Sequence, residues 1–249
     1  FGKQMKADSY DLKQQIGVVP QNVAVFHELS VEDNINYFCG LYVSDKAKRK
    51  TLVDEAIRFV SLEEFRKFRP GKLSGGLLRR LNIACGIAHQ PKLIFMDEPT
   101  VAVDPQSRNA ILEGIRRLNA QGATIVYTSH YMEEVEEICS RIIIIDKGKT
   151  IAAGSKEELK AGIMMKEKIE VEQVKLQEQQ VQDIQDIANV FSVQYNANVL
   201  QVKFTEGKRN LANLLDYFTQ ENITYGKVYS QQPTLNDVFL EITGKQLRD

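Results

Sequence analysis

The sequence predicts an α/β domain with a parallel sheet, followed by a small α+β unit. Continuous apolar runs over residues 93–96, 123–128 and 141–145 alternate with helical segments. Alternation of this kind favours strands that run parallel and are joined through helices. Beyond about Gly162 the composition shifts, and segments with alternating apolar and polar residues replace the continuous apolar runs.

This shift divides the chain into two predicted domains, residues 1–160 and residues 161–249. A helical subdomain is expected within the first domain, over about residues 26–89. The second domain opens with the polar, Gln-rich segment 175–180. Its expected elements are a hairpin with strands at 191–195 and 200–204, a helix at 210–220, a strand at about 224–229 and a last helix at 234–243.

Capping residues mark the helix starts of the first domain, and a short strand over residues 16–20, broken by its proline, precedes them. Ser30 can cap a helix whose first turn is acidic, which the helix dipole favours. Asp104 is a cap with a proline directly behind it, at the first helical position. Helices are therefore expected over residues 30–41, 45–60, 74–89, 104–120 and 131–139.

Charge and composition argue against several classes of protein. Lys and Arg number 32 against 33 Asp and Glu, so no basic surface points to nucleic acid as a partner. The three cysteines are scattered, which disfavours a zinc site or a disulfide framework and fits a reducing cytosol. No stretch approaches the ~18 apolar residues of a membrane span, and the first residues do not form a signal peptide. We therefore expect an intracellular protein whose role at a membrane depends on a partner.

A serine and two glycines, Ser74, Gly75 and Gly76, open one of the expected helices. Free backbone N–H groups and the positive end of the helix dipole make such a start an anion site, because no side chain blocks close approach. A glycine turn with a serine cap is the alternative.

Two adjacent carboxylates, Asp97 and Glu98, follow an apolar strand at its carboxyl end, where open α/β sheets bind ligands. Asp97 can hold Mg²⁺ directly or through water, and Glu98 can polarise a water molecule for attack on a phosphate. His130 follows the next apolar strand in the same way and could donate to a phosphate oxygen. A solvated acidic turn and a capping histidine are the alternatives.

Taken together, these segments resemble the ATP-binding-cassette (ABC) ATPases over residues 1 to about 160. The resemblance rests on the order and spacing of Gln21, Leu73-Ser74-Gly75-Gly76, Met96-Asp97-Glu98-Pro99, Asp104 and Ser129-His130. It implies a P-loop NTPase-like parallel sheet with a helical subdomain, and ATP and Mg²⁺ as cofactors.

The resemblance also implies roles for single residues around the nucleotide. Gln21 would sense Mg²⁺ and the attacking water and would link to the membrane subunit. Asp97 would organise Mg²⁺, and Glu98 would act as general base. His130 would be the switch histidine on the γ-phosphate.

The remaining implied roles concern a second subunit. Ser74, Gly75 and Gly76 would form the signature loop, which clasps the γ-phosphate of ATP held by the partner subunit. Asp104 would lie in the loop that crosses the dimer interface. The sequence departs from the family at Leu77, where glutamine is usual, and at Ala102, where glycine is frequent; neither change removes these contacts.

A larger departure concerns the P-loop, GxxxxGK[ST]. This motif should precede Gln21 by a few tens of residues, and the sequence starts too late to contain it. The tripeptide Gly148-Lys149-Thr150 is expected to be a turn between two strands instead. The chain is therefore either a fragment of a longer protein or a cassette that has lost autonomous catalysis. Glu98 and His130, still in place for catalysis, favour the fragment.

The end of the chain, Pro233 to Gly244, resembles the end of drug-resistance and sodium-export type ABC ATPases. It is also expected to be an amphipathic helix with a core stripe of Leu235, Val238, Phe239 and Ile242. Such subunits pair with separate multi-spanning permeases and carry a C-terminal accessory domain.

The function that the resemblance implies is that of the ATPase subunit of an ABC-2-type exporter. It would act as a homodimer or heterodimer, in the cytoplasm, bound to the inner face of the cell membrane through its permease. As given, without a P-loop, the chain is expected to be inactive alone. One alternative is a catalytically incompetent cassette that serves a competent partner; another is a soluble cassette acting on ribosomes or DNA, which the single cassette and the lack of a basic patch disfavour.

Overall fold

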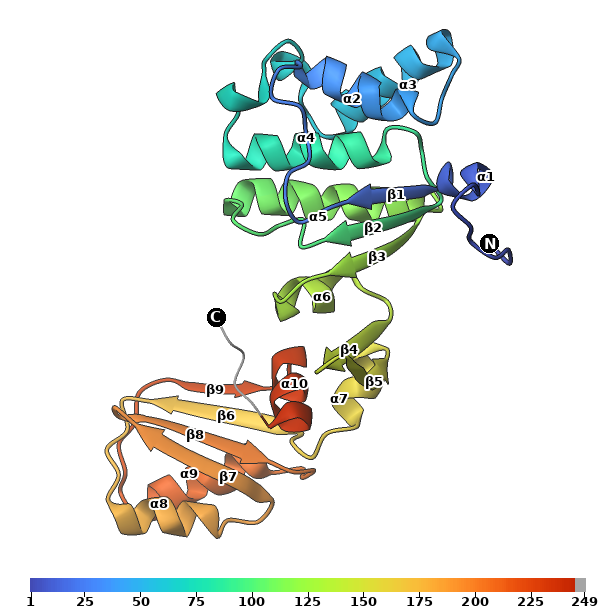
Figure 1. Ribbon diagram of the computed structural model, residues 1–249. Coiled ribbons are helices and arrows are strands. Elements are labelled where there is room, and N and C mark those ends of the chain that lie inside the picture. Colours follow the sequence, from blue (N-terminus) through green and yellow to red (C-terminus); the bar gives the residue numbers. More distant parts are fainter. Residues whose placement is uncertain (245–249) are drawn as a thin grey trace. The chain divides into compact units, whose positions relative to one another are not determined.

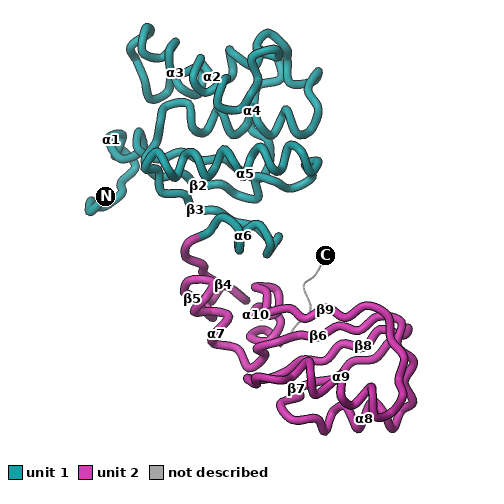
Figure 2. Tube along the Cα trace, turned by 180° about the vertical axis from the view of Figure 1, so that it is seen from behind, with its two compact units in different colours: residues 1–139 teal, residues 140–249 magenta. Residues whose placement is uncertain are grey.

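A computed structural model describes residues 1–244. The chain forms two compact units, residues 1–139 and residues 140–249 (Figure 2), which are described separately below. The predicted domain boundary at residue 160 lies further along the chain than this division. Residues 245–249 of the predicted second domain lie outside the described part of the chain. No helix among the described residues is both long and apolar enough to cross a membrane.

The first unit contains a parallel sheet in the order β1-β2-β3 (Figure 1). Its strands are β1 (Ile16–Val19), β2 (Leu93–Asp97) and β3 (Thr124–Thr128). In register, Val18 pairs with Phe95 and Phe95 with Val126. The parallel arrangement predicted for β2 and β3 is therefore confirmed, and β1 joins them in the same direction. The carboxyl ends of these strands meet at one edge of the sheet.

The helices of this unit from α2 to α6 begin where the sequence predicts them, whereas α1 was not predicted. The side chains of Ser30, Asp45, Ser74 and Asp104 each accept a hydrogen bond from the backbone N–H three residues ahead, as N-caps do. The helices are α1 (Tyr10–Lys13), α2 (Val31–Gly40), α3 (Lys46–Phe59), α4 (Gly75–Ile87), α5 (Pro105–Ala120) and α6 (Met132–Ile138), with 3₁₀ turns at Glu63–Phe65 and Pro70–Lys72.

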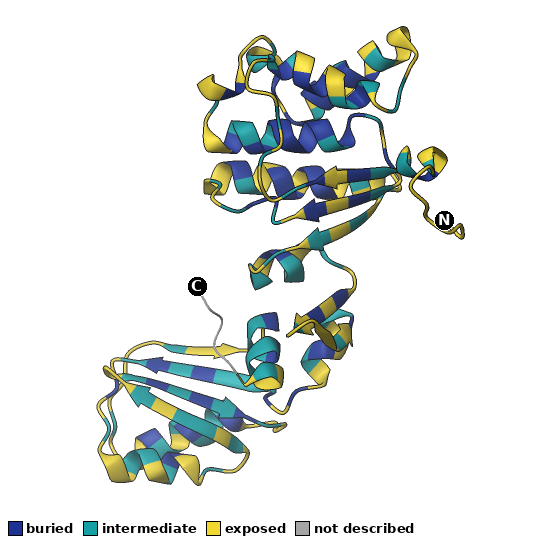
Figure 3. Ribbon diagram, in the orientation of Figure 1, coloured by how far each residue is buried: buried dark blue, intermediate teal, exposed yellow. Residues whose placement is uncertain are grey.

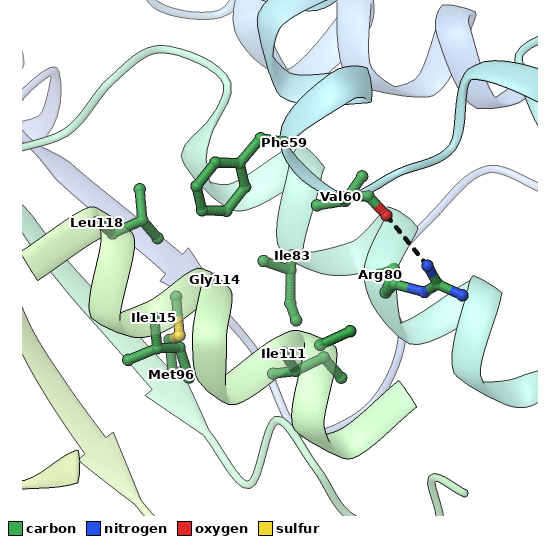
Figure 4. A pocket seen from close by; sticks show the side chains of 10 residues that line it. Phe59, Val60, Arg80, Ile83, Met96, Ile111, Gly114, Ile115 and Leu118 are labelled. Atoms are coloured by element: carbon green, nitrogen blue, oxygen red, sulfur yellow. Dashed lines mark hydrogen bonds between the residues drawn. The ribbon is translucent and has the colours of Figure 1, made fainter. Parts of the chain in front are cut away.

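Helix α4 is the centre of this unit, because it contacts α2 and α3 on one side and β1 and α5 on the other (Figure 1). Figure 4 shows where the end of α3 meets α4 and α5 around an apolar cavity of about 20 Å³, lined among others by Phe59, Ile83 and Ile111. A space of this size holds at most one water molecule, so it is a packing void and not a ligand pocket.

One face of the sheet is covered and the other carries an exposed apolar row. Val19, Ile94 and Met96 are buried in the core shared with α4 and α5. On the opposite face, Val18, Phe95 and Val126 are 58 %, 41 % and 42 % exposed. Exposed positions alternate with buried or half-buried ones along these strands (Figure 3). Parallel sheets are normally covered on both faces, so this row, which we call the apolar row, is unusual.

Backbone-to-backbone packing joins β1 to α4. A Cβ added to Gly17 would lie 2.5 Å from the carbonyl oxygen of Gly86 and 2.7 Å from the Cγ of Pro91. A Cβ on Gly86 would in turn lie 2.7 Å from the carbonyl oxygen of Val18. Only glycine allows the strand and the helix to approach this closely.

We expect the substitution Gly17→Ala to lower the free energy of unfolding by about 1–3 kcal/mol, the usual cost of overpacking a core. The methyl group would push β1 away from α4, since the neighbouring carbonyl oxygen belongs to the backbone and cannot rotate away. Gly71→Ala is the control, because a Cβ there meets nothing within 4 Å. Urea unfolding of both variants tests this, and equal midpoints would contradict it.

The second unit opens with a hairpin that corrects one prediction. The run 141–145, expected as a further strand of the parallel sheet, forms β4 (Ile142–Asp146) and pairs antiparallel with β5 (Lys149–Gly154). Four isoleucines suggested burial on both faces, but Ile143 and Ile145 are 59 % and 61 % exposed. The tight turn predicted at Gly148 is confirmed: Lys147 and Gly148 both have positive φ, 49° and 73°, as the two-residue turn of a hairpin requires.

The rest of the second unit is an α+β fold whose sheet has the strand order β7-β8-β6-β9. The strands are β6 (Glu167–Glu172), β7 (Val190–Asn196), β8 (Val199–Phe204) and β9 (Val228–Gln231), with helices α7 (Lys156–Ala161), α8 (Glu178–Gln185), α9 (Asn210–Gln220) and α10 (Leu235–Thr243). The hairpin, α9 and α10 were predicted, whereas β6, α7 and α8 were not, and β9 begins later than predicted. In α10, Leu235 and Val238 are buried as expected, but Ile242 is 40 % exposed.

Candidate functional site

The ends of β2 and β3 bring three of the predicted site residues together. The Nδ1 atom of His130 lies 3.0 Å from Oε2 of Glu98. The hydroxyl of Thr128, the last residue of β3, donates to Oδ1 of Asp97 at 2.6 Å. Because Asp97 and Thr128 are register partners, the parallel sheet itself sets the spacing between the carboxylates and the histidine.

The backbone at Glu98 is held in an uncommon conformation. Its φ is +46°, a region that non-glycine residues adopt only when the surroundings hold them there. The N–H of Glu98 donates to both the carbonyl and the hydroxyl oxygen of Thr128, at 3.2 and 3.1 Å. This sharp turn after β2 aims the Glu98 side chain at His130, and the sequence alone gave no sign of Thr128's part in it.

The side chains of Glu98 and His130 differ in their exposure to solvent. The Glu98 side chain is 17 % exposed, while that of His130 is 56 % exposed. The histidine ring also contacts the ring of Tyr131, with centroids 4.2 Å apart. His130 is therefore open to a ligand that approaches the sheet edge, and Glu98 lies behind it in a more shielded position.

Gln21 lies beyond the end of β1, and its backbone is bound to α4. The carbonyl oxygen of Gln21 accepts a hydrogen bond of 2.6 Å from Arg79, a buried residue of α4. Asn82, also buried on α4, donates to Pro20 and accepts from the N–H of Ala24. These bonds fix the loop around Gln21 through its backbone, so the exposed glutamine side chain remains available. Arg79 and Asn82 were not among the predicted site residues.

The glycines at the start of α4 lie beside the start of α5. A Cβ on Gly76 would lie 2.4 Å from Oγ of Ser107 and 2.9 Å from Oδ2 of Asp104. A Cβ on Gly75 would have only the carbonyl oxygen of Ala102 near it, at 4.0 Å. Gly76 is therefore required for packing within the chain, whereas Gly75 faces open space at the helix start.

Ser74 and Asp104 are both occupied as helix caps. The Ser74 hydroxyl accepts from the N–H of Leu77 at 3.3 Å, and the Asp104 carboxylate accepts from the N–H of Ser107 at 2.9 Å. The Ser107 N–H, followed by its hydroxyl, lowers the pKa of the Asp104 carboxyl, which therefore stays ionised at neutral pH. Ala102, which replaces the frequent glycine of the family, has a φ of +57°, and glycine adopts this conformation without strain.

The donor set at the sheet edge fits Mg²⁺ bound together with a phosphate group. Among the described residues there is no cluster of three or more His, Cys, Asp or Glu side chains that could hold a metal by itself. Mg²⁺ does not need one, because it keeps several waters and is commonly held by one or two carboxylates plus substrate phosphates. Asp97, exposed at the end of β2, offers one such carboxylate.

This combination of a parallel sheet, an acidic pair at its edge and a glycine-started helix defines a nucleotide-binding α/β protein. The sequence matches the ABC transporter family over residues 2–101. Residues 154–243 match the C-terminal domain of DrrA1-3-like ATP-binding proteins. The chain belongs to the ATP-binding subunits of ABC transporters, and the predicted resemblance is confirmed.

Relatives similar over nearly the whole chain include two named for resistance and export. The linearmycin resistance ATP-binding protein LnrL of Bacillus subtilis is 37 % identical over 95 % of this chain and 77 % of its own length. The Nod factor export ATP-binding protein I of Rhizobium sp. (strain N33) is 32 % identical over 99 % of this chain and 78 % of its own.

Solved structures agree on the fold. An ATP-binding subunit of an ABC transporter has a TM-score of 0.56 at 23 % identity and covers 62 % of this chain and 64 % of its own. CbiO1 from Clostridium perfringens, part of the ABC transporter complex cbiONQ, has a TM-score of 0.55 at 24 % identity and covers 61 % of each chain. At these identities the likeness shows the P-loop NTPase fold, as predicted.

Proposed function

We propose that this protein is the ATP-hydrolysing subunit of an ABC-2-type exporter. The observation that carries the proposal is the pair Glu98 and His130, held 3.0 Å apart beside Asp97 at the edge of the parallel sheet. A carboxylate held beside a histidine at the end of a strand can accept a proton from a water molecule, as hydrolysis requires. Two relatives support the export role, one named for linearmycin resistance and one named for Nod factor export.

In this proposal each residue has one task at the sheet edge. Asp97 would hold Mg²⁺, which would neutralise phosphate charge when bound. Glu98 accepts the proton of the attacking water, as a positioned carboxylate can. His130 orients Glu98 through Nδ1, and its exposed Nε2 faces the γ-phosphate, to which it donates when both ring nitrogens carry a proton. Gln21, on a loop fixed to α4, senses the same water and Mg²⁺.

Ser74, Gly75 and Gly76 are proposed to act on the nucleotide of a second subunit, in a homodimer or a heterodimer. The first N–H groups of α4 have no carbonyl partner within the helix, and Gly75 leaves them accessible. Asp104, next to this helix start, would lie in the same interface. A signature loop at a helix start is complementary to an anion and therefore needs a phosphate brought to it from outside.

A P-loop must supply the other half of the site, and the sequence contains no GxxxxGK[ST] motif. The apolar row Val18, Phe95 and Val126 is the surface on which we propose that a P-loop segment packs.

The chain as it stands should bind ATP–Mg²⁺ only weakly, because its signature loop is half of a shared site and it has no P-loop nest for the β- and γ-phosphates. Calorimetric titration with ATP–Mg²⁺ should give no saturation in the micromolar range. A micromolar dissociation constant would contradict the shared site.

The proposed partner in the membrane is a multi-spanning permease, which would hold the subunit at the inner face of the cell membrane. An aromatic surface close to the Gln21 loop supports this contact: Phe26 and Tyr37 are 42 % and 47 % exposed and their rings lie 4.8 Å apart. Asn34, fully buried, exchanges hydrogen bonds with the N–H and C=O of Phe26. The backbone that carries this exposed ring is thus fixed in place, which lowers the cost of docking a partner against it.

The division into a cassette (residues 1–160) and an accessory domain (residues 161–249) is part of the proposal.

The proposed function is tested with a P-loop fusion, in which a P-loop segment of an active ABC ATPase precedes Phe1. Phosphate release by this fusion, stimulated by its permease, would support the ATPase. A fusion that binds ATP but releases no phosphate would favour the incompetent cassette.

A further inference from the structure

A buried carboxylate, Glu134, lies behind the proposed catalytic pair and belongs to none of the motifs discussed above. It is on α6, and its side chain is 3 % exposed. Burial of a carboxylate is costly unless the charge is paired and its oxygens are hydrogen-bonded. The groups that compensate this charge therefore indicate what Glu134 holds together.

Three hydroxyl groups converge on one oxygen of Glu134. Oε2 accepts from Tyr127 at 2.5 Å, from Thr100 at 2.8 Å and from Ser129 at 3.2 Å. Thr100 belongs to the turn that follows Glu98, and Ser129 directly precedes His130. One carboxylate oxygen thus ties the Glu98 turn to the His130 turn.

The second oxygen of Glu134 faces α5. Its Oε1 lies 2.6 Å from Nε of Arg108, one turn into the helix that Asp104 caps. Neither of these two buried atoms has a hydrogen-bond partner, so the attraction between their charges is what compensates the burial of this oxygen. Arg108 also covers the ring of Tyr131, 4.3 Å from its centroid, and that ring contacts His130.

We propose that Glu134 is a positioning residue that sets the distance between Glu98 and His130 and links both to the start of α5. It does not touch the reacting atoms. It acts through Thr100 and Ser129 on the two turns, and through Arg108 on the helix that follows the interface loop. The role in turnover rests on the proposed ATPase function, whereas the geometric role does not.

The test follows the ring signal of His130 by nuclear magnetic resonance in the whole chain, which has 3 histidines. His130→Gln assigns the signal, and Glu98→Gln shows how it responds when the carboxylate partner is changed. Glu134→Gln should move the His130 signal by a comparable amount and leave those of His27 and His89 in place. An unmoved His130 signal in a folded Glu134→Gln protein would overturn the proposal.

Two further changes keep the test decisive if Glu134→Gln fails to fold. Thr100→Val and Tyr127→Phe preserve shape and each remove one hydroxyl from Oε2, so each should move the His130 signal in the same direction. Asn34→Ala is the matched control: it removes another fully buried polar group, lowers the melting temperature and should leave His130 unaffected. If it moved the His130 signal equally, general loosening would be the cause and the proposal would fail.

In the P-loop fusion, Glu134→Gln should lower kcat about 10- to 100-fold, the scale expected when a reacting group is misplaced by about 1 Å. The dissociation constant for ATP should remain unchanged. If the fusion is inactive, the proposed ATPase function fails and kcat cannot be compared. The His130 signal still tests the geometric role of Glu134, because it is measured without turnover. An equal loss of ATP affinity would assign Glu134 to the fold alone.

Discussion

Replacing Glu98 by glutamine in the P-loop fusion should leave ATP binding intact and reduce phosphate release by about 10²–10⁴-fold, the usual worth of a positioned general base. Glutamine has nearly the same shape as glutamate and can still hydrogen-bond with His130, so the turn after β2 should survive. It cannot accept the proton of the attacking water. Steady-state phosphate release and equilibrium ATP binding, measured on the same preparation, separate the two effects.

Glu133→Gln is the matched control for this prediction, because it is the same chemical change in the first turn of α6, close to His130 in the sequence. We expect it to retain the turnover of the parent. If Glu98→Gln also retained that turnover, Glu98 would be a structural residue of the turn and another group would have to serve as the base.

Gly75→Asp should abolish hydrolysis at the site that its own signature loop completes, while the subunit keeps its stability and its ATP affinity. A Cβ at Gly75 meets only the carbonyl oxygen of Ala102, at 4.0 Å. An acidic side chain in the first turn is also favourable for α4 itself. The negative charge of the aspartate would, however, repel the γ-phosphate of the nucleotide that a partner subunit presents.

Gly76 is unsuitable for this experiment, although the sequence alone suggests it equally well. An added Cβ would clash with Ser107, whose Oγ and Cβ would lie 2.4 and 2.8 Å away. The aspartate would therefore damage the packing of α4 on α5 within its own chain. A loss of activity in Gly76→Asp would say nothing about a second subunit.

Mixed dimers of the P-loop fusion decide whether the site is shared. With Gly75→Asp in one subunit and an inactive P-loop in the other, both lesions fall in the same composite site, and about half of the activity should remain if the sites act independently. With both lesions in one subunit, paired with a normal one, each site carries a lesion and activity should be lost. Equal activity in the two arrangements would contradict the shared site.

The sequence was sufficient for most local structure in the first unit, because the signals there are local. Ser30, Asp45, Ser74 and Asp104 cap the helices that follow them, and each cap needs only the N–H groups of the next turn. The strand that ends at Asp97 was recognisable from its own apolar run. The order of the motifs was likewise enough to indicate the family.

In the second unit, local signals were enough for the hairpin of β7 and β8 and for α9 and α10, but they were insufficient elsewhere. An apolar run such as Ile142 to Ile145 specifies a strand but not the strand with which it pairs, because pairing depends on residues elsewhere in the chain. Here the short turn at Lys147 and Gly148 brings β5 back antiparallel to β4. Helix α8 lies in a polar segment and is anchored by one fully buried residue, Ile184. So few apolar positions give no clear helical period.

The sequence by itself determined which chemical groups this protein carries to the sheet edge, Asp97, Glu98 and His130, because each follows a strand whose end the sequence marks. Only the tertiary structure decided how these groups are held. Thr128, Arg79 and Glu134 look like ordinary polar residues in the sequence, and Glu134 is one of four glutamates in α6. What distinguishes Glu134 is burial against Thr100, Arg108 and Tyr127, and burial is created by segments that meet only when the chain folds.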